Sequence, residues 1–357
     1  MNRISIPYFK LCVRLSSLLL LAGCLSPIDF PAENLGGRLV VSGQISPLKE
    51  QNIIQVGLTA DTKRLPFPVS GAQITLLDDA GGAYSYVENP NKVGYYILPD
   101  VEGVPGRTYH IVVTTPEGNV YQSVEEKMPM QSGQVATTYE ILFEDFTDGE
   151  GTVSNEPFIK VYANAIVPET ESPSYLKWSV DEVFRLTPTD FPDPFGSVPP
   201  SCYIAQNADP QRIALFNGAE VKVRSIDNLL VTSRIINWTF VERHYFTTTQ
   251  SSLTEEAYDY WRKVNILANQ VGSIFDTPPA EISGNMYNIN DPSEKVLGYF
   301  QAANQTYDRF FILPFNLPFF LSSECLYNPQ AEEFSYPPRC LACLGVANSS
   351  WDVPEWF

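Results

Sequence analysis

The sequence predicts a mainly β protein, with an N-terminal β-sandwich over residues 38–130 and a second β-rich domain over residues 131–357 that carries one amphipathic helix. Two observations predict this class. Apolar and polar residues alternate through short segments bounded by turn-forming residues, which is typical of strands with one buried face. Helical periodicity stands out at one place only, so helices do not separate consecutive strands as they do in a parallel α/β sheet.

Residues 1–23 have the order of a secretion signal. Basic residues and no acidic residue precede an apolar run over 15–21, and this run is shorter than the roughly 18 to 20 residues that a spanning helix needs. The run leads into Leu-Ala-Gly before Cys24, which resembles the lipobox of bacterial lipoproteins, where the cysteine is acylated and becomes the new N-terminus. We therefore expect acyl chains on Cys24 to hold the protein at a membrane. The alternative is an ordinary signal peptide with a cysteine at this place by chance.

The next segment, residues 24–37, contains two prolines and a terminal Gly-Gly without periodicity, so we expect a tether. Period-two alternation then marks strands around 54–58, 72–76 and 109–113. Segments rich in turn-forming residues separate them, at 78–82, 88–91 and 116–119. About seven strands at this spacing indicate a β-sandwich. The arrangement resembles immunoglobulin-like, transthyretin-like and carboxypeptidase-regulatory-like sandwiches, which usually bind or space rather than catalyse.

The amphipathic helix is predicted at residues 253–271 in the second domain. Ser252 with Glu255 fits a capping box, and Gly272 can end the helix in the left-handed conformation. We expect the helix to cover the core of the second domain, with docking to another protein as the alternative. Apolar residues at three- and four-residue steps form its stripe: Leu253, Ala257, Tyr260, Trp261, Val264, Leu267, Ala268 and Val271.

The chain has six cysteines, of which Cys12 leaves with the signal and Cys24 takes lipid. An even number of remaining cysteines in an oxidising envelope predicts two disulfides, with three possible connectivities. A zinc site or a redox pair at Cys340-x-x-Cys343 is the competing interpretation, but the second short-spaced ligand pair and the βαβ context are missing. We expect structural disulfides that attach the C-terminal tail to the body. The candidates are Cys202, Cys325, Cys340 and Cys343.

The charge balance excludes several classes of partner. The net charge is −18, and loss of residues 1–23 removes three basic residues and no acidic one, which leaves −21. Nucleic-acid binding needs a basic surface, so it is excluded. Charge-driven adhesion to an anionic lipid surface is disfavoured for the same reason.

Residues for catalysis or metal binding are sparse. The only histidines, His110 and His244, lie in strand-like segments without a recognisable catalytic motif. Nucleophile-elbow, zinc-protease, Walker and dinucleotide-binding motifs are absent from the sequence. We therefore assign no catalytic residue, no metal ligand and no cofactor.

Two further segments leave alternatives open. Residues 144–150 carry four carboxylates beside a glycine, and calcium favours such oxygen-rich loops, but the spacing is not that of an EF-hand. An acidic hairpin tip is the simpler interpretation. The segment 310–321 is rich in aromatics and broken by prolines. We expect it to be buried under the tail, with an exposed patch for a partner as the alternative.

Several segments together resemble a known family. They are Pro-Pro followed by Gly284-Asn285, the run Leu297-Gly-Tyr-Phe300, and the tail with Cys340-Leu-Ala-Cys343. With the lipobox, the sandwich and the helix, they resemble uncharacterised lipoproteins of the Bacteroidota, domain of unknown function 4249. The resemblance implies an outer-membrane lipoprotein, often found with TonB-dependent receptors, without an established activity. Residues 25–29 match poorly to the signal for export to the cell surface, so the sequence does not decide whether the protein faces the periplasm or the cell surface.

The sequence thus favours a non-enzymatic binding or accessory lipoprotein that works beside an outer-membrane receptor. The sequence does not identify a small-molecule or glycan ligand. One alternative is a carboxylate-based envelope hydrolase of glycans or peptides, because any pair of the many carboxylates could serve. The other is a structural or adhesive surface component.

Overall fold

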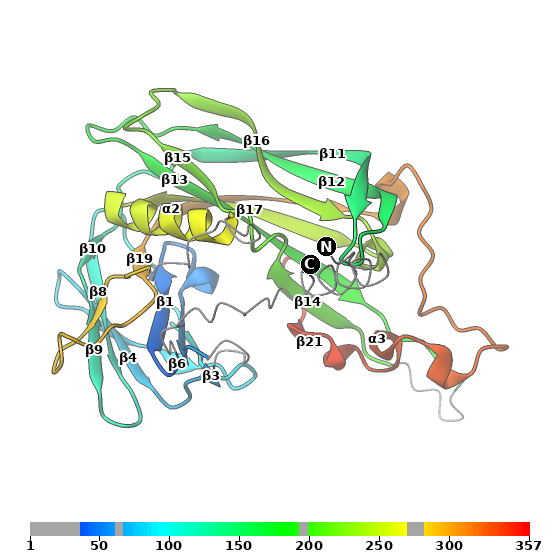
Figure 1. Ribbon diagram of the computed structural model, residues 1–357, viewed down its shortest axis with the longest axis horizontal. Helices are drawn as coiled ribbons and strands as arrows, with labels where there is room; N and C mark the ends of the chain where they lie inside the picture. Colours follow the sequence, from blue (N-terminus) through cyan, green and yellow to red (C-terminus); the bar gives the residue numbers. More distant parts are fainter. Residues whose placement is uncertain (1–35, 61–66, 193–198, 270–281) are drawn as a thin grey trace, which may run out of the picture.

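The computed structural model describes residues 36–60, 67–192, 199–269 and 282–357, and most regular elements in them are strands (Figure 1). The predicted mainly β class is confirmed. Residues 1–35 lie outside the described part, so the signal, the lipid on Cys24 and most of the tether stay predictions. Among the described residues, no helix is both long and apolar enough to cross a membrane.

The N-terminal body consists of two sheets that share one apolar core. Ile54 and Val56 from one sheet and Ile74, Leu76 and Ile111 from the other are buried in it, as the alternation predicts. The first sheet has the order β19-β1-β2-β7-β6, with β3 paired to β2: β1 Leu39–Ile45, β2 Ile53–Leu58, β3 Phe67–Pro68, β6 Val87–Glu88, β7 Tyr95–Ile97 and β19 Phe300–Ala302. The second has the order β18-β9-β8-β4-β5, with β10 paired to β8: β4 Gln73–Asp78, β5 Ala83–Ser85, β8 Thr108–Thr114, β9 Val120–Ser123, β10 Glu126–Lys127 and β18 Met286–Asn288.

Each sheet of this sandwich contains one strand from late in the chain. β18 pairs antiparallel with β9, and β19 pairs in parallel with β1, where Gly43 lies opposite Phe300. The predicted domain boundary at residue 130 therefore assigns two strands of the sandwich, β18 and β19, to the second domain. Strands of three residues are too short to show alternation, and their partners lie far away in sequence, so no local pattern marks them. The return of the chain ties the two domains together.

The second domain stacks a three-stranded sheet on a six-stranded one, and a core that includes Val161, Trp178 and Phe246 lies between them (Figure 1). The three-stranded sheet has the order β11-β12-β16: β11 Gln134–Thr147, β12 Val153–Ile166 and β16 Ser225–Ile235. The six-stranded sheet has the order β20-β17-β13-β14-β21, with β15 paired to β13: β13 Tyr175–Leu186, β14 Cys202–Asn207, β15 Ala214–Asn217, β17 His244–Leu253, β20 Asn304–Ile312 and β21 Ser349–Ser350.

The predicted helix is present as α2, Glu255–Asn269, and lies between the sandwich and the six-stranded sheet (Figure 1). The predicted capping box is wrong. Ser252 belongs to β17, and Thr254 caps the helix because its Oγ1 accepts a hydrogen bond of 3.1 Å from the amide of Ala257. The helix packs mainly through its first turns, where Ala257 and Tyr258 are buried. The predicted end at Gly272 lies outside the described residues.

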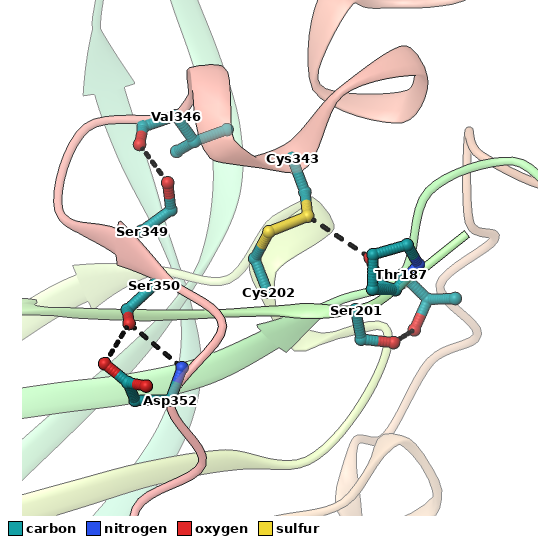
Figure 2. Close-up of a disulfide and its surroundings, with 9 residues drawn as sticks. Thr187, Ser201, Cys202, Cys343, Val346, Ser349, Ser350 and Asp352 are labelled. Atoms are coloured by element: carbon teal, nitrogen blue, oxygen red, sulfur yellow. Dashed lines mark hydrogen bonds between the residues drawn. A yellow bond between two sulfur atoms is a disulfide. The ribbon is translucent and has the colours of Figure 1, made fainter.

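Two structural disulfides are present, as predicted, but only one attaches the tail to the body, and the other closes a loop within the tail. Cys202 of β14 pairs with Cys343 (Figure 2). Cys325 pairs with Cys340. The two cysteines of the Cys-x-x-Cys segment thus bond to different partners, which excludes a redox pair between them. Strand β21 adds to β14 beside the first bridge. The tail also contains α3 Pro338–Leu341 and short 3-10 turns η3 Pro314–Asn316, η4 Glu333–Ser335 and η5 Cys343–Gly345; η1 Lys49–Gln51 and η2 Trp238–Phe240 lie earlier.

Candidate functional site

A cavity of about 530 Å³ opens where the sandwich, α2 and the returning segment meet. Its lining comes from three regions that are distant in sequence: the β9–β10 connection and β10, the first turns of α2, and the segment around β18 and β19. Ligand sites commonly form at such junctions between domains. The lining residues are Val124, Glu125, Glu126, Lys127, Thr254, Glu256, Asp259, Tyr260, Lys263, Ser283, Gly284, Asn285 and Tyr299.

The carboxyl group of Glu126 is the most constrained group in this cavity. Its residue is 4% exposed, although it lines the cavity. The hydroxyl of Thr254 donates a hydrogen bond of 2.9 Å to Oε2 of Glu126, and the hydroxyl of Tyr299 donates one to Oε1. The amide of Asn285 lies 3.5 Å from the same Oε1. Donors from three separate segments therefore converge on one carboxyl group.

Burial raises the pKa of Glu126 to about 7, and the nearby negative charge of Glu256 acts in the same direction. The hydrogen bonds from Tyr299 and Thr254 oppose this shift, because they stabilise the ionised form. The carboxyl group thus changes its protonation state near neutral pH. A strongly shifted carboxyl group in a cavity is a typical mark of a functional site.

Tyr299 stays a neutral donor over the whole physiological range. Burial raises its pKa, and the adjacent carboxylate of Glu126 raises it further. Its ring lies against that of Tyr260 on α2, with ring centroids 4.8 Å apart. These two rings give the cavity an aromatic wall beside its acidic groups.

Gly284 and Asn285 hold the returning segment in place. A Cβ at Gly284 would lie 1.4 Å from the carbonyl oxygen of Gly298, so only glycine fits. Asn285 bonds the backbone of Phe300 from both ends of its amide, with Oδ1 accepting from the N–H at 2.9 Å and Nδ2 donating to the carbonyl at 2.7 Å. The Gly-Asn segment and the Leu-Gly-Tyr-Phe segment therefore meet at this cavity.

Thr254 couples the cavity to the helix. Its Oγ1 donates to Glu126 and accepts from the amide that it caps. The position of the helix therefore depends on the same hydroxyl that binds the buried carboxyl group. Because Glu256, Asp259 and Lys263 follow on α2 and line the cavity, a shift of the helix would move its charged wall.

A second cavity, of about 700 Å³, adjoins the first, since Lys127 and Thr254 line both. The rest of its lining comes from residues 128–131 and 169–175 and from the end of β17. Ser252 lies in this wall, 4% exposed, and its hydroxyl has no hydrogen-bond partner. Several other buried hydroxyl groups of the described residues share this state, so it does not mark Ser252 as a ligand contact.

The two histidines lie elsewhere. His110 is half-buried in β8, whereas His244 is fully buried in β17. Nε2 of His244 lies 3.1 Å from a carboxylate oxygen of Glu182, and Nε of Arg234 donates to the same oxygen at 2.6 Å. Burial acts against ionisation of Glu182, but these partners hold its pKa below the usual range. None of the group lines a described cavity, so it is a buried ionic network of the core.

The acidic segment 144–150 forms the tip of the β11–β12 hairpin, which agrees with the simpler interpretation. Oδ1 of Asp148 accepts hydrogen bonds from the amides of Glu150 and Thr152 at 2.9 and 2.8 Å. Within the described ranges, no group of three or more His, Cys, Asp or Glu side chains is placed to hold a metal ion.

The segment 310–321 is divided between core and surface. Ile312 and Leu317 are buried, as expected for the whole segment, but Phe315 and Phe320 are 79% and 90% exposed. Burial was therefore the wrong expectation for these two rings. Pro314 begins the 3-10 turn η3, so the chain leaves β20 at this point and cannot keep all its rings on one face.

The sequence assigned none of the cavity residues to a site. Glu126 lies within Glu-Glu-Lys, which has the composition of a solvated surface. Only the resemblance segments, which contain Asn285 and Tyr299, pointed to this region.

A family model matches residues 26–309, which include every lining residue of the first cavity. Comparison with curated proteins finds no relative that matches the chain. The matched segment covers the sandwich with both returning strands and most of the second domain. The chain therefore belongs to the family described as domain of unknown function (DUF4249).

Proposed function

We propose that the protein is a non-enzymatic binding lipoprotein, held at the outer membrane through Cys24, that takes a ligand into the cavity around Glu126. In this proposal it acts as an accessory subunit beside an outer-membrane receptor. The observation that carries it is the convergence of Tyr299, Thr254 and Asn285 on a buried carboxyl group inside a cavity at a domain junction.

The arrangement favours binding over catalysis. Both hydroxyl donors that reach Glu126 are engaged with it, so neither is poised to activate a nucleophile. The lining of the first cavity contains no histidine and no cysteine. The lining is mostly polar and charged, and the rings of Tyr260 and Tyr299 form its aromatic part, so the cavity suits a polar ligand that can stack on a ring.

The test blocks the cavity with a large side chain and measures whether a small molecule is still bound. Val124 lines the cavity and is 54% exposed, so Val124→Trp should obstruct the opening without disturbing the core. Val93 is 53% exposed in the sandwich and lines no described cavity, so Val93→Trp is the matched control. Full-length protein extracted from membranes in mild detergent is analysed by native mass spectrometry. We expect a small molecule to accompany the wild type and Val93→Trp but not Val124→Trp. A wild type that is always free of ligand would contradict the proposal.

A carboxylate-based hydrolase is the second candidate, because a carboxyl group with a pKa raised to about 7 lies near a charged Glu256. This candidate predicts hydrolysis of glycosides or peptides with a rate that changes near pH 7. Glu126→Gln would abolish the hydrolysis, whereas a binding protein would show no turnover in either form. Absence of turnover across glycoside and peptide panels would rule this candidate out.

The anchor has its own test. Cys24→Ala should abolish incorporation of labelled fatty acid, whereas Cys12→Ala, in the segment expected to be removed, should not. Protease treatment of intact cells then distinguishes the two faces of the outer membrane: degradation of the protein indicates the cell surface, and protection indicates the periplasmic face.

A further inference from the structure

One face of the six-stranded sheet is covered at one end only. The odd-numbered residues of β17 and β20 share this face, and Tyr245 lies opposite Phe311 while Thr247 lies opposite Arg309. The even-numbered residues, among them Phe246, face the core against the three-stranded sheet. The open face is therefore the one turned away from β11, β12 and β16 (Figure 1).

The two ends of this face differ. Towards the sandwich it is closed, because Gln305 donates a hydrogen bond of 2.8 Å to Ser251 and also contacts Gln44 of β1. Towards the tail it stays accessible, since Tyr307 and Phe311 are 49% and 45% exposed. Large aromatic rings are therefore presented at the tail end of the sheet.

Two guanidinium groups flank these rings. The guanidinium carbon of Arg309 lies 3.5 Å from the ring centroid of Trp356, and that of Arg243 lies 5.2 Å from the centroid of Phe311. Tyr245 connects the two stacks, with its ring centroid 5.3 Å from Phe311 and 5.1 Å from Trp356. We call these five residues, Arg243, Tyr245, Arg309, Phe311 and Trp356, the arginine–aromatic face.

Among the described residues, the two arginines of this face bond to hydroxyl groups and not to carboxylates. Nε of Arg309 donates to the hydroxyl of Thr247 at 2.8 Å, and Arg243 donates to the hydroxyl of Tyr245 at 3.3 Å. In the part of the chain that the structure describes, neither arginine has a carboxylate within ion-pair distance. Other arginines of this acidic chain do have one: Arg107, Arg185, Arg212, Arg224, Arg234, Arg262 and Arg339.

Three acidic side chains near this face do not pair with its arginines. Asp181 lies on the same face opposite Thr247, but beyond ion-pair distance of either arginine. Glu50 acts on Arg309 from a distance, and Glu242 is engaged with Arg185. Arg309 is partly buried and Arg243 is exposed. A carboxylate that binds them would form charge-assisted hydrogen bonds, which are stronger than those between neutral groups.

A recess adjoins the face. A cavity of about 420 Å³ lies beside Arg243, and Tyr203 and Phe357 form part of its wall. It is large enough for a side chain. A flat aromatic surface next to such a recess suits a polypeptide that places one side chain in the recess and lays its neighbours on the rings.

We propose that the arginine–aromatic face docks an acidic polypeptide segment of a partner protein. Tyrosine, tryptophan and arginine are the residues enriched at the energetic centres of protein interfaces. The two free guanidinium groups select carboxylates, and the rings select apolar side chains between them. The net charge of −18 repels acidic partners elsewhere on the chain, so binding would be confined to this face. The proposal does not depend on the Glu126 cavity.

The test uses a fluorescent peptide that carries glutamates and phenylalanines, with fluorescence anisotropy of the full-length protein in detergent as the measurement. We expect saturable binding that weakens with salt and is lost when glutamines replace the glutamates. The double variant Arg243→Ala and Arg309→Ala should weaken binding by about tenfold or more. The matched control, Arg212→Ala with Arg224→Ala, removes two exposed arginines elsewhere and should not change it.

Further variants separate charge from folding. Trp356→Ala removes one stacking ring but no charge, and should weaken binding with the circular dichroism spectrum unchanged. Arg309→Lys keeps the charge without the planar stack and should bind with intermediate affinity. Equal binding by the wild type and the double arginine variant would overturn the proposal. So would an absence of peptide binding, or a preference for polygalacturonate, which would indicate an acidic glycan instead.

Discussion

The hydroxyl of Tyr299 donates a hydrogen bond to the carboxyl group of Glu126, across 173 positions of sequence. The bond joins the residue directly before the returning strand β19 to the edge strand β10 of the sandwich. Thr254, at the start of α2, donates to the other oxygen of the same carboxyl group. One side chain thus connects the sandwich, the helix and the returning segment.

Tyr299→Phe should raise the pKa of Glu126 further above 7. The phenol hydroxyl stabilises the ionised carboxylate and so lowers the pKa of Glu126. Without it, the effect of burial, which raises this pKa, is opposed by fewer hydrogen bonds. Carbon-13 NMR of labelled glutamate carboxyl groups measures the titration. Tyr260→Phe is the matched control, because that ring lines the same cavity but does not hydrogen-bond Glu126. An unchanged titration in Tyr299→Phe would show that the hydrogen bond does not tune the carboxyl group.

The free energy of unfolding should depend on pH through Glu126. Its pKa rises from the usual 4.5 to about 7 on folding, so the folded state holds the proton more tightly. The stabilisation that this proton gives to the folded state is fully present below about pH 4.5 and is lost as the pH rises through 7. It amounts to at most about 3 kcal/mol.

Glu126→Gln should remove this slope, because glutamine resembles the protonated acid and does not ionise. Urea unfolding between pH 4 and pH 8 measures the effect as the difference between wild type and variant. Glu125→Gln, at an exposed neighbouring position, should keep the wild-type slope. A variant curve parallel to that of the wild type would show that Glu126 does not titrate in this range.

The strands with clear alternation could be predicted, because their signal is local. Residues 54–58, 72–76 and 109–113 all form strands with one buried face. The strands β18 and β19 could not, since each has three residues and pairs with a strand far away in sequence. The helix was predicted to within two residues at its start, but its cap was not, because Ser252 and Thr254 are both good caps and only the end of β17 decides between them.

The site was harder to predict than the fold. A glutamate between a glutamate and a lysine has the pattern of a solvated surface. Glu126 is buried because β19 packs against β10 and because Thr254 and Tyr299 contact its carboxyl group. Its donors come from three distant segments, so no spacing in the sequence reveals them. The cysteines were easier, since their even number in a chain predicted to be exported predicts disulfides directly, but only the fold could select the pairs.

Removing the two disulfides should have unequal effects. The Cys202–Cys343 bridge closes a separation of 141 residues and Cys325–Cys340 one of 15, so loop-closure entropy predicts losses of about 5 and about 3 kcal/mol. Serine replacement of the first pair should also free the segment after Cys343, including Trp356, which stacks on Arg309. Limited proteolysis followed by mass spectrometry would then show early cleavage near the C-terminus. The second pair, replaced in the same way, is the control and should leave β21 protected.

Gly284→Ala tests whether the returning segment controls the cavity. The added methyl group would lie 1.4 Å from the carbonyl oxygen of Gly298. This oxygen belongs to the backbone and cannot turn away as a side chain can, so the segment must move. We expect a loss of stability of about 3 kcal/mol or more, as for severe overpacking. Gly345→Ala is the control, because its added methyl group meets nothing within 4 Å. Since movement of the segment shifts Asn285 and Tyr299 away from Glu126, Gly284→Ala should also disturb the carboxyl titration near pH 7, whereas Gly345→Ala should not. A stable Gly284→Ala protein with a normal titration would mean that the close approach at Gly298 does not position the site.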